Sequence, residues 1–196
     1  KDFLPGSTAV PVSGKVMDSN DIEHLVDASL DGWLTTGRFN AQFEKALAEF
    51  IGVKHVLTVN SGSSANLLAL TALTSPKLGD KALQKGDEVI TVPYTFISTV
   101  GSIVTAGAKP VFVDINLNNL GAAFDKIEKA VNKNTRAIFL THVLGFNSLS
   151  DKLLRLIKKK KIFLIEDVCE SHGALYKNKK LGTFGNISNF SFYYAH

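Results

Sequence analysis

Three short stretches, each just after an apolar run, carry the residue types that could do chemistry in this chain. In residues 60–66, NSGSSAN, a Gly-Ser-Ser turn leads directly into a helical pattern. The free N–H groups and positive dipole of such a helix start, together with two hydroxyls, can bind a phosphate. The alternative is that Ser61 or Ser63 simply caps the helix. The stretch matches neither the GxGxxG motif nor a P-loop, which disfavours dinucleotide and ATP sites.

Phe96 and Asp167 are the other two candidates. Phe96 begins an expected helix after an apolar run, so its ring could stack on a flat ligand or pack in the core. Asp167 lies at the exit of the apolar run IFLI, where an unpaired charge would be costly. It should therefore face a nearby Arg or Lys or a protonated pyridine nitrogen, unless it caps a following helix. A phosphate cradle, an aromatic platform and an acid that holds a pyridinium are together the parts of a pyridoxal phosphate site.

The elements that must position these residues alternate from residue 54 onward. Short β-rich runs predict strands over 55–60, 87–93, 109–115, 135–143, 162–167 and 187–193. Amphipathic stretches predict helices over 63–73, 96–107, 124–132 and 148–160, and a hairpin or irregular loop is expected over 174–185. This alternation is typical of an α/β fold, a mainly parallel sheet with helices on both faces. Ligands of such sheets bind beyond the carboxyl ends of the strands, where the candidates lie.

Residues 1–53 are predicted to be an N-terminal helical segment, and residues 54–196 the cofactor-binding large domain. The first expected helix covers 19–33, with Asp18 or Ser19 as its N-cap. The second covers 38–52 and is expected to stop at Gly52. Its apolar face, which we expect to pack in the core, consists of Phe39, Phe43, Leu47 and Phe50.

The composition, 45% apolar and 20% charged, is that of an ordinary globular protein. We find no apolar run long enough to span a membrane and no signal-peptide core at the start. Lysine clusters fall at predicted turns and helix ends, so nucleic-acid binding is not expected. Cys169 is the single cysteine and no His or Cys pair has metal spacing, so we expect no metal site and a reducing, cytoplasmic setting.

The chain resembles the DegT/DnrJ/EryC/StrS sugar aminotransferase family over nearly its whole length. The resemblance is carried by WLTTGRFNAQFEKALAEFIG, NSGSSANLLAL, KGDEVITVPYTFISTV, KPVFVDI, IEDVCESHGA and GTFGNISNFSFYYAH. It implies an aspartate-aminotransferase-like large domain of PLP fold type I, with the small C-terminal domain missing. The chain is then expected to be an N-terminal fragment, inactive as it stands, of an enzyme that is a homodimer.

His196 stands where that family carries the lysine that forms a Schiff base with the cofactor. In this replacement the chain resembles a subgroup of the family, the nucleotide-sugar 3-dehydrases. These enzymes remove the C3 hydroxyl of 4-keto-6-deoxyhexoses in the synthesis of dideoxysugars for the lipopolysaccharide O-antigen. LTTGRF and ALTSPKLGDKAL resemble members that act on CDP-4-keto-6-deoxyhexose. The resemblance implies pyridoxamine phosphate held non-covalently, with His196 as the base that removes a proton from the cofactor's C4′ carbon.

The same resemblance implies roles for the remaining candidates. Phe96 would stack on the cofactor ring and Asp167 would hold its pyridinium nitrogen. Glu170 would face the ring's 3-hydroxyl, although a surface Glu on a helix is the alternative. The residues expected to bind the cofactor phosphate are Gly62, Ser63, Ser64 and Ser191. His142 and His172 are interpreted as structural.

Three alternatives stay open at this point. Some 3-dehydrases hold a [2Fe-2S] cluster and work with a reductase partner, and the cysteines for it would lie beyond His196. A cluster-free 3-dehydratase or a sugar aminotransferase is the runner-up, although an aminotransferase needs a lysine at position 196. A non-catalytic relative that binds sugar nucleotides is the alternative from another class.

Overall fold

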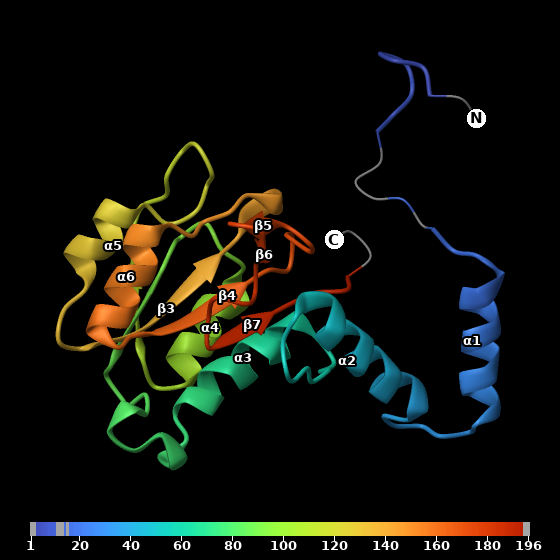
Figure 1. The fold of residues 1–196 in the computed structure, drawn as a ribbon, viewed down its shortest axis with the longest axis horizontal. Coiled ribbons are helices and arrows are strands. Elements are labelled where there is room, and N and C mark those ends of the chain that lie inside the picture. Colours follow the sequence, from blue (N-terminus) through green and yellow to red (C-terminus); the bar gives the residue numbers. More distant parts are fainter. Residues whose placement is uncertain (1–2, 11–13, 15, 194–196) are drawn as a thin grey trace.

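A parallel sheet of five strands forms the centre of the molecule (Figure 1). The computed structural model describes residues 3–10, 14 and 16–193. Its strands are β1 Glu88–Thr91, β2 Lys109–Phe112, β3 Thr135–Thr141, β4 Phe163–Asp167 and β7 Ile187–Asn189. The strand order is β2-β1-β3-β4-β7, and every neighbouring pair is parallel. The predicted α/β architecture is therefore confirmed.

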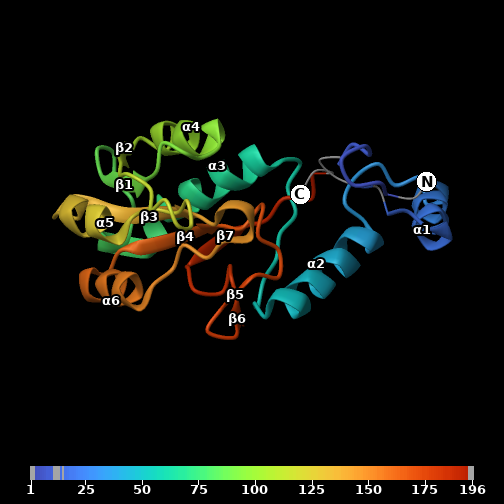
Figure 2. The same cartoon turned by 90° about the horizontal axis from the view of Figure 1, so that it is seen from above.

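Helices cover both faces of this sheet (Figure 2). On one face lie α3, Gly62–Leu73, and α4, Ile97–Thr105, and on the other lie α5, Phe124–Ala130, and α6, Asp151–Lys160. Two apolar clusters fill the space between sheet and helices. Leu70 of α3 and Ile103 of α4 belong to one cluster, and Leu153 of α6 belongs to the other. Burial on both faces explains why β3 and β4 each contain a continuous apolar run, residues 137–140 in β3 and 163–165 in β4.

A short hairpin interrupts the pattern between β4 and β7. Its strands are β5, Leu175–Tyr176, and β6, Lys179–Lys180, which pair in the antiparallel sense. The two residues between them have positive φ angles, as a tight two-residue hairpin turn requires. Of the two structures expected over 174–185, a hairpin or an irregular loop, the hairpin is present.

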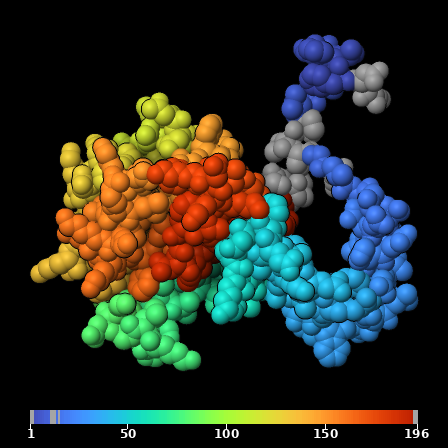
Figure 3. All heavy atoms as spheres, in the orientation of Figure 1, coloured from blue at the N-terminus to red at the C-terminus, as the bar shows by residue number. Residues whose placement is uncertain are grey.

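The N-terminal helices lie beside the sheet and do not cover it. Helix α1, Ser19–Leu30, begins at the N-cap Asp18, and α2, Arg38–Ile51, ends at Gly52 in the left-handed conformation. In the space-filling view the segment that carries α1 stands apart from the main body (Figure 3). No residue of α1 is buried, and Ile51 is the one buried residue of α2. The division of the chain at residue 53 stays a prediction.

The expectation that the apolar face of α2 packs in the core is wrong. Phe50 is 51% exposed, and the side chain of Lys180 lies over its ring. Phe43 makes an edge contact with Phe192, with ring centroids 5.0 Å apart. The physical reason is the position of α2 at the edge of the sheet, next to β7. No other element of the described residues covers its apolar face there.

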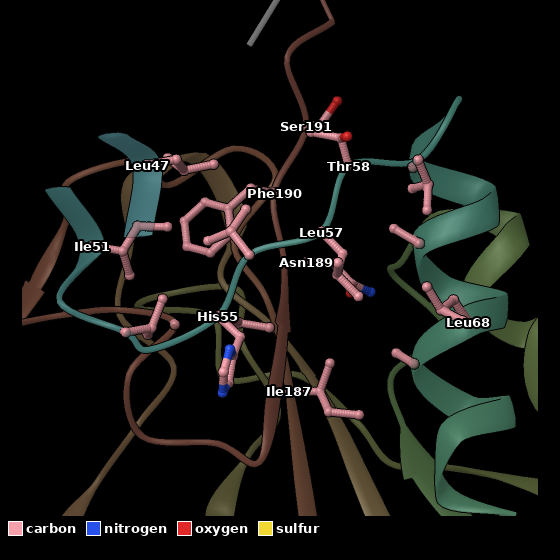
Figure 4. Close-up of a pocket in the computed structure, with 18 of the residues that line it drawn as sticks. Leu47, Ile51, His55, Leu57, Thr58, Leu68, Ile187, Asn189, Phe190 and Ser191 are labelled. Carbon is pink, nitrogen blue, oxygen red and sulfur yellow. The ribbon is translucent and has the colours of Figure 1, made fainter. Parts of the chain in front are cut away.

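The strand predicted over residues 55–60 is also not formed. These residues run extended, and the backbone N–H of Thr58 donates to the Glu44 carboxylate, 2.8 Å away, instead of to a neighbouring strand. A hollow of about 920 Å³ separates this segment from β7 (Figure 4). We call it the edge groove; its lining includes Leu47, Leu57, Leu68, Ile187 and Phe190. The sequence of residues 55–60 is typical of a strand, but a strand needs a neighbouring strand to hydrogen-bond with. The edge groove keeps this segment away from β7, the strand that it would pair with.

Candidate active site

A second cavity, of about 710 Å³, opens at the carboxyl ends of β1, β3 and β4. It is lined by side chains from five separate stretches of the chain. The predicted site residues that line it are Gly62, Ser63, Phe96, Asp167, Glu170 and Ser191. Ser64 does not line it, and His196 lies outside the described residues. The structure therefore brings most of the predicted site residues together around one cavity.

The start of α3 supplies unpaired backbone donors to this cavity. Ser61 is the N-cap, and its hydroxyl accepts a hydrogen bond from the N–H of Ser64 at 3.2 Å. The Ser61 hydroxyl also donates to the Ser64 hydroxyl. Capping by Ser61 is thus real, but it leaves the N–H groups of Gly62 and Ser63 without a partner among the described residues. Two free N–H groups at the positive end of a helix are a suitable cradle for an anion.

Asp167, at the end of β4, is a buried carboxylate that lines the cavity. It is 6% exposed and accepts a hydrogen bond from the N–H of Cys169 at 3.1 Å. A turn follows it, so the alternative of capping a following helix is wrong. Within the described residues no Lys or Arg forms an ion pair with it. Because a buried charge without a counter-ion is costly, this position suits a ligand that brings a positive charge, such as a pyridinium.

Aromatic side chains stand at the mouth of the same cavity. Phe96 is the N-cap residue of α4 and is 68% exposed, so the alternative that it packs in the core is wrong. Tyr94, two residues earlier, is also exposed and lines the cavity, and the sequence analysis did not select it. Its position could have indicated it, since Tyr94 lies in the same stretch after β1 as Phe96. Exposed rings at a cavity mouth can stack on a flat ligand.

Glu170 joins two loops at the rim. Its carboxylate accepts a hydrogen bond from the N–H of Leu144 at 3.1 Å, across from the loop after β3. Leu144 has a positive φ of 51°, a conformation that side chains other than glycine rarely adopt. Ser171 adds a second link, accepting a hydrogen bond from the N–H of Gly145 at 3.0 Å. Glu170 lies in a turn and not on a helix, so the alternative given for it is wrong in that detail.

Cys169 also lines the cavity but is unsuited to nucleophilic chemistry. Burial raises the pKa of its thiol well above the usual range, and the neighbouring Asp167 charge acts in the same direction. The thiolate, which is the reactive form of cysteine, is therefore scarce at neutral pH. Among the described residues no group of three or more His, Cys, Asp or Glu side chains could hold a metal ion.

A buried pair that sequence reasoning missed supports the site from below. Glu166 and His142 are both fully buried, with His142 Nε2 and a Glu166 oxygen 3.1 Å apart. The N–H of Ser148 donates to Nδ1 of His142, so that nitrogen carries no proton and Nε2–H donates to Glu166. Glu166 also accepts hydrogen bonds from the backbone N–H groups of Gly182, Phe184 and Gly185. One carboxylate thus ties the 182–185 loop to the end of β4, next to Asp167.

We expect Glu166→Gln to destabilise the protein by about 3 kcal/mol, because its amide nitrogen would face N–H donors and leave them unsatisfied. The free energy of unfolding from urea denaturation measures this. Glu49→Gln, at an exposed position of α2, is the matched control and should change stability by less than about 0.5 kcal/mol. Equal stability of the two variants would contradict the assigned role of Glu166.

The same variant has a defined pH dependence. Burial alone raises the pKa of Glu166, but the hydrogen bonds from His142, Gly182 and Gly185 outweigh it and hold the pKa below its ordinary value. A carboxylate with a lowered folded-state pKa stabilises the fold fully above the unfolded pKa of about 4.3, and this stabilisation disappears as the pH falls through the folded-state pKa. The stability difference between the wild type and Glu166→Gln should therefore be constant above about pH 5 and shrink in more acidic solution.

Comparison with solved structures defines the class of protein. The Escherichia coli GDP-4-keto-6-deoxy-D-mannose-3-dehydratase, solved with bound hydrated PLP, matches with a TM-score of 0.88 at 33% identity. The match covers 95% of this chain and 47% of that one. The fold is therefore that of the large domain of PLP-dependent enzymes of fold type I. No helix in the described part of the chain is long and apolar enough to cross a membrane.

The chain belongs to the DegT/DnrJ/EryC1/StrS aminotransferase family, whose family model matches residues 15–196. The lipopolysaccharide biosynthesis protein RfbH of Salmonella typhimurium is 52% identical over 196 residues, which are 100% of this chain and 45% of the relative. The dTDP-4-dehydro-2,6-dideoxy-D-glucose 3-dehydratase of Saccharopolyspora spinosa is 44% identical over 99% of this chain and 42% of the relative. The chain thus spans less than half the length of these relatives. It is a member of a family of PLP-dependent sugar-modifying enzymes that includes both dehydratases and aminotransferases.

Proposed function

We propose that this chain is the N-terminal part of a longer enzyme that removes the C3 hydroxyl of a nucleotide-linked 4-keto-6-deoxyhexose, using pyridoxamine phosphate. The observation that carries the proposal is the buried Asp167 carboxylate, which has no cationic partner among the described residues and shares a cavity with the free N–H groups of α3. His196 in place of a lysine favours dehydration over amine transfer. The two relatives named 3-dehydratases support the same reaction class.

Each group of the chain has a separate task in this proposal. The N–H groups of Gly62 and Ser63, with the Ser191 hydroxyl, bind the cofactor phosphate, and Phe96 stacks on the ring. Asp167 keeps the ring nitrogen protonated, and Glu170 borders the side of the 3-hydroxyl. When bound, pyridoxamine phosphate supplies an amine for the sugar ketone and a ring that withdraws electrons. His196 takes a proton from the C4′ position, as suits an imidazole near neutral pH.

The substrate that we propose is CDP-4-keto-6-deoxyhexose, in the formation of 3,6-dideoxyhexoses for the O-antigen. A homodimer, a cytoplasmic setting, a [2Fe-2S] cluster and a reductase partner are part of the proposal for the longer enzyme. A cluster-free 3-dehydratase is the second candidate, because Cys169 alone cannot hold such a cluster. Four closely spaced cysteines in the polypeptide beyond His196 would favour the iron–sulfur enzyme.

A titration of the longer enzyme with pyridoxamine phosphate, followed by the cofactor's absorption band, tests the proposal. Saturable binding together with consumption of a CDP-linked 4-keto-6-deoxyhexose is expected. Binding of the sugar nucleotide without any binding of pyridoxamine phosphate would instead support the non-catalytic alternative.

We expect Phe96→Leu to weaken pyridoxamine phosphate binding about tenfold, because a stacked aromatic ring contributes roughly 0.5–1.5 kcal/mol beyond its buried area. Phe112→Leu is the matched control, since Phe112 ends β2, is similarly exposed and does not line the cavity. Dissociation constants from the absorption titration give the comparison. If both variants bind as tightly as the wild type, Phe96 is not the stacking residue.

A further inference from the structure

A chain of hydrogen-bonded polar side chains runs beneath the candidate site. We call it the polar relay, and its members are Asn189, Asn66, Ser98, Thr99, Thr95 and Thr141. Asn189 Nδ2 donates to Asn66 Oδ1 at 2.6 Å, and Asn66 Nδ2 donates to the hydroxyls of Ser98, at 3.0 Å, and Thr99, at 3.3 Å. Thr95 continues the relay, with its hydroxyl 3.3 Å from that of Thr99 and 3.1 Å from that of Thr141.

The relay connects α3, the start of α4, β3 and β7, which lie around the strand that carries Asp167. Asn66 is on α3, one turn after Gly62; Ser98 and Thr99 are in the first turn of α4, just after Phe96. Its two ends are Asn189 on β7 and Thr141 on β3. These two residues flank Asp167 in the sheet register, because Thr141 pairs with Asp167 and Asp167 pairs with Asn189. The relay therefore passes over the strand that carries the acid and returns to the sheet on both sides of it.

Asn66 is the branch point of this relay. Its amide oxygen accepts one hydrogen bond and its amide nitrogen donates two, which uses both donors of the group. Asn66 is only 4% exposed, and Asn189 and Thr99 are buried as well. Water therefore has little access to replace a lost partner, and removal of the Asn66 amide leaves several buried polar groups unsatisfied.

Directional contacts are needed here because the packing around them is not directional. Helices α3 and α4 pack on each other and on the sheet through apolar residues such as Leu70 and Ile103. Apolar burial favours contact but does not by itself fix how far one helix slides along the other. Hydrogen bonds with defined donors and acceptors do fix it.

We propose that Asn66 is a positioning residue, which holds the start of α3 at a set place relative to the start of α4 and to Asp167. It thereby sets the distance between the phosphate cradle and the ring platform, which different elements supply. This inference rests on the proposed function for its cofactor but on the relay alone for the coupling between the elements.

Two ligands of the longer enzyme separate positioning from simple stability. Inorganic phosphate needs the cradle alone, whereas pyridoxamine phosphate needs the cradle, the platform and the acid in register. Asn66→Ala is expected to weaken pyridoxamine phosphate at least tenfold and inorganic phosphate by less than twofold. The matched control is Asn119→Ala, which removes a partly buried amide that bonds Asn147 and Gly121 away from the cavity. It should leave both affinities unchanged.

Hydrogen exchange provides a readout that does not depend on the cofactor. In Asn66→Ala, amide exchange should accelerate together in peptides that cover the starts of α3 and α4 and the end of β7, and Asn119→Ala should not reproduce this. Equal loss of both ligands in Asn66→Ala, equal effects of the two variants, or acceleration confined to α3 would each overturn the proposal. A wild-type enzyme that does not bind pyridoxamine phosphate would overturn the proposed function, and the exchange data would then decide the coupling by themselves.

Discussion

Asp167→Asn is expected to lower the turnover of the longer enzyme by about a thousandfold while leaving the fold intact. The variant keeps an oxygen that can accept the hydrogen bond from the Cys169 N–H, so the turn after β4 is preserved. It loses the negative charge that, in the proposed site, would hold the pyridine nitrogen protonated, and a preorganised charge of this kind contributes roughly a hundredfold to a thousandfold in rate. Steady-state kinetics with the CDP-linked sugar, alongside thermal unfolding, measures both effects.

Asp114→Asn is the matched control for this prediction. Asp114 also accepts a backbone hydrogen bond, from the N–H of Ile115, but it is outside the cavity lining. Its replacement should leave turnover within twofold of the wild type. Turnover of Asp167→Asn close to that of the wild type would show that Asp167 does not face the cofactor nitrogen.

His196→Asn is expected to reduce turnover by a factor of about 10² to 10⁴, the usual contribution of a positioned general base. Affinity for pyridoxamine phosphate should change little, because the phosphate cradle, Phe96 and Asp167 are all retained. The measurement is a pair of experiments on one sample, the absorption titration and the rate of sugar consumption. Loss of binding in the variant would assign His196 to affinity instead of proton transfer, and unchanged turnover would remove it from the mechanism.

The sheet was predictable because the local residue pattern identifies most of its strands. Residues buried on both faces of a sheet are mostly apolar, so β3 and β4 each contain a continuous apolar run that stands out between amphipathic helices. The same local signal failed at residues 55–60 and along α2. Residues 55–60 have the pattern of a strand, but no neighbouring strand in the described part of the chain hydrogen-bonds to them. Helix α2 has the pattern of a core helix, but no layer of the described residues covers its apolar face. The local sequence gives a segment a preference for strand or helix, and contacts with other elements decide whether the segment adopts and buries that structure.

The candidate site was predictable to the extent that position alone defines it. Phe96 and Asp167 could be selected because they follow β1 and β4 and parallel strands end at one edge, and the Gly-Ser-Ser stretch because it opens a helix. Ser64 illustrates the limit, since only the structure shows that Ser61 occupies its N–H. The Glu166–His142 pair and the polar relay could not be found in this way. Their contacts join residues that are far apart in the chain, such as Asn66 and Asn189, and no local pattern marks them.

The edge groove has a consequence for how this chain behaves when it is produced by itself. β7 is the last strand on its side of the sheet, and the extended residues 55–59 beyond it form no ladder. An uncovered sheet edge of this kind is a template onto which strands of other molecules add, and natural proteins normally protect such edges. Leu57, exposed beside the groove, would help such additions by burying apolar surface. Residues 1–196 in isolation should therefore form intermolecular β-sheet aggregates. A polypeptide segment that lies in the edge groove would prevent this by covering the edge of β7.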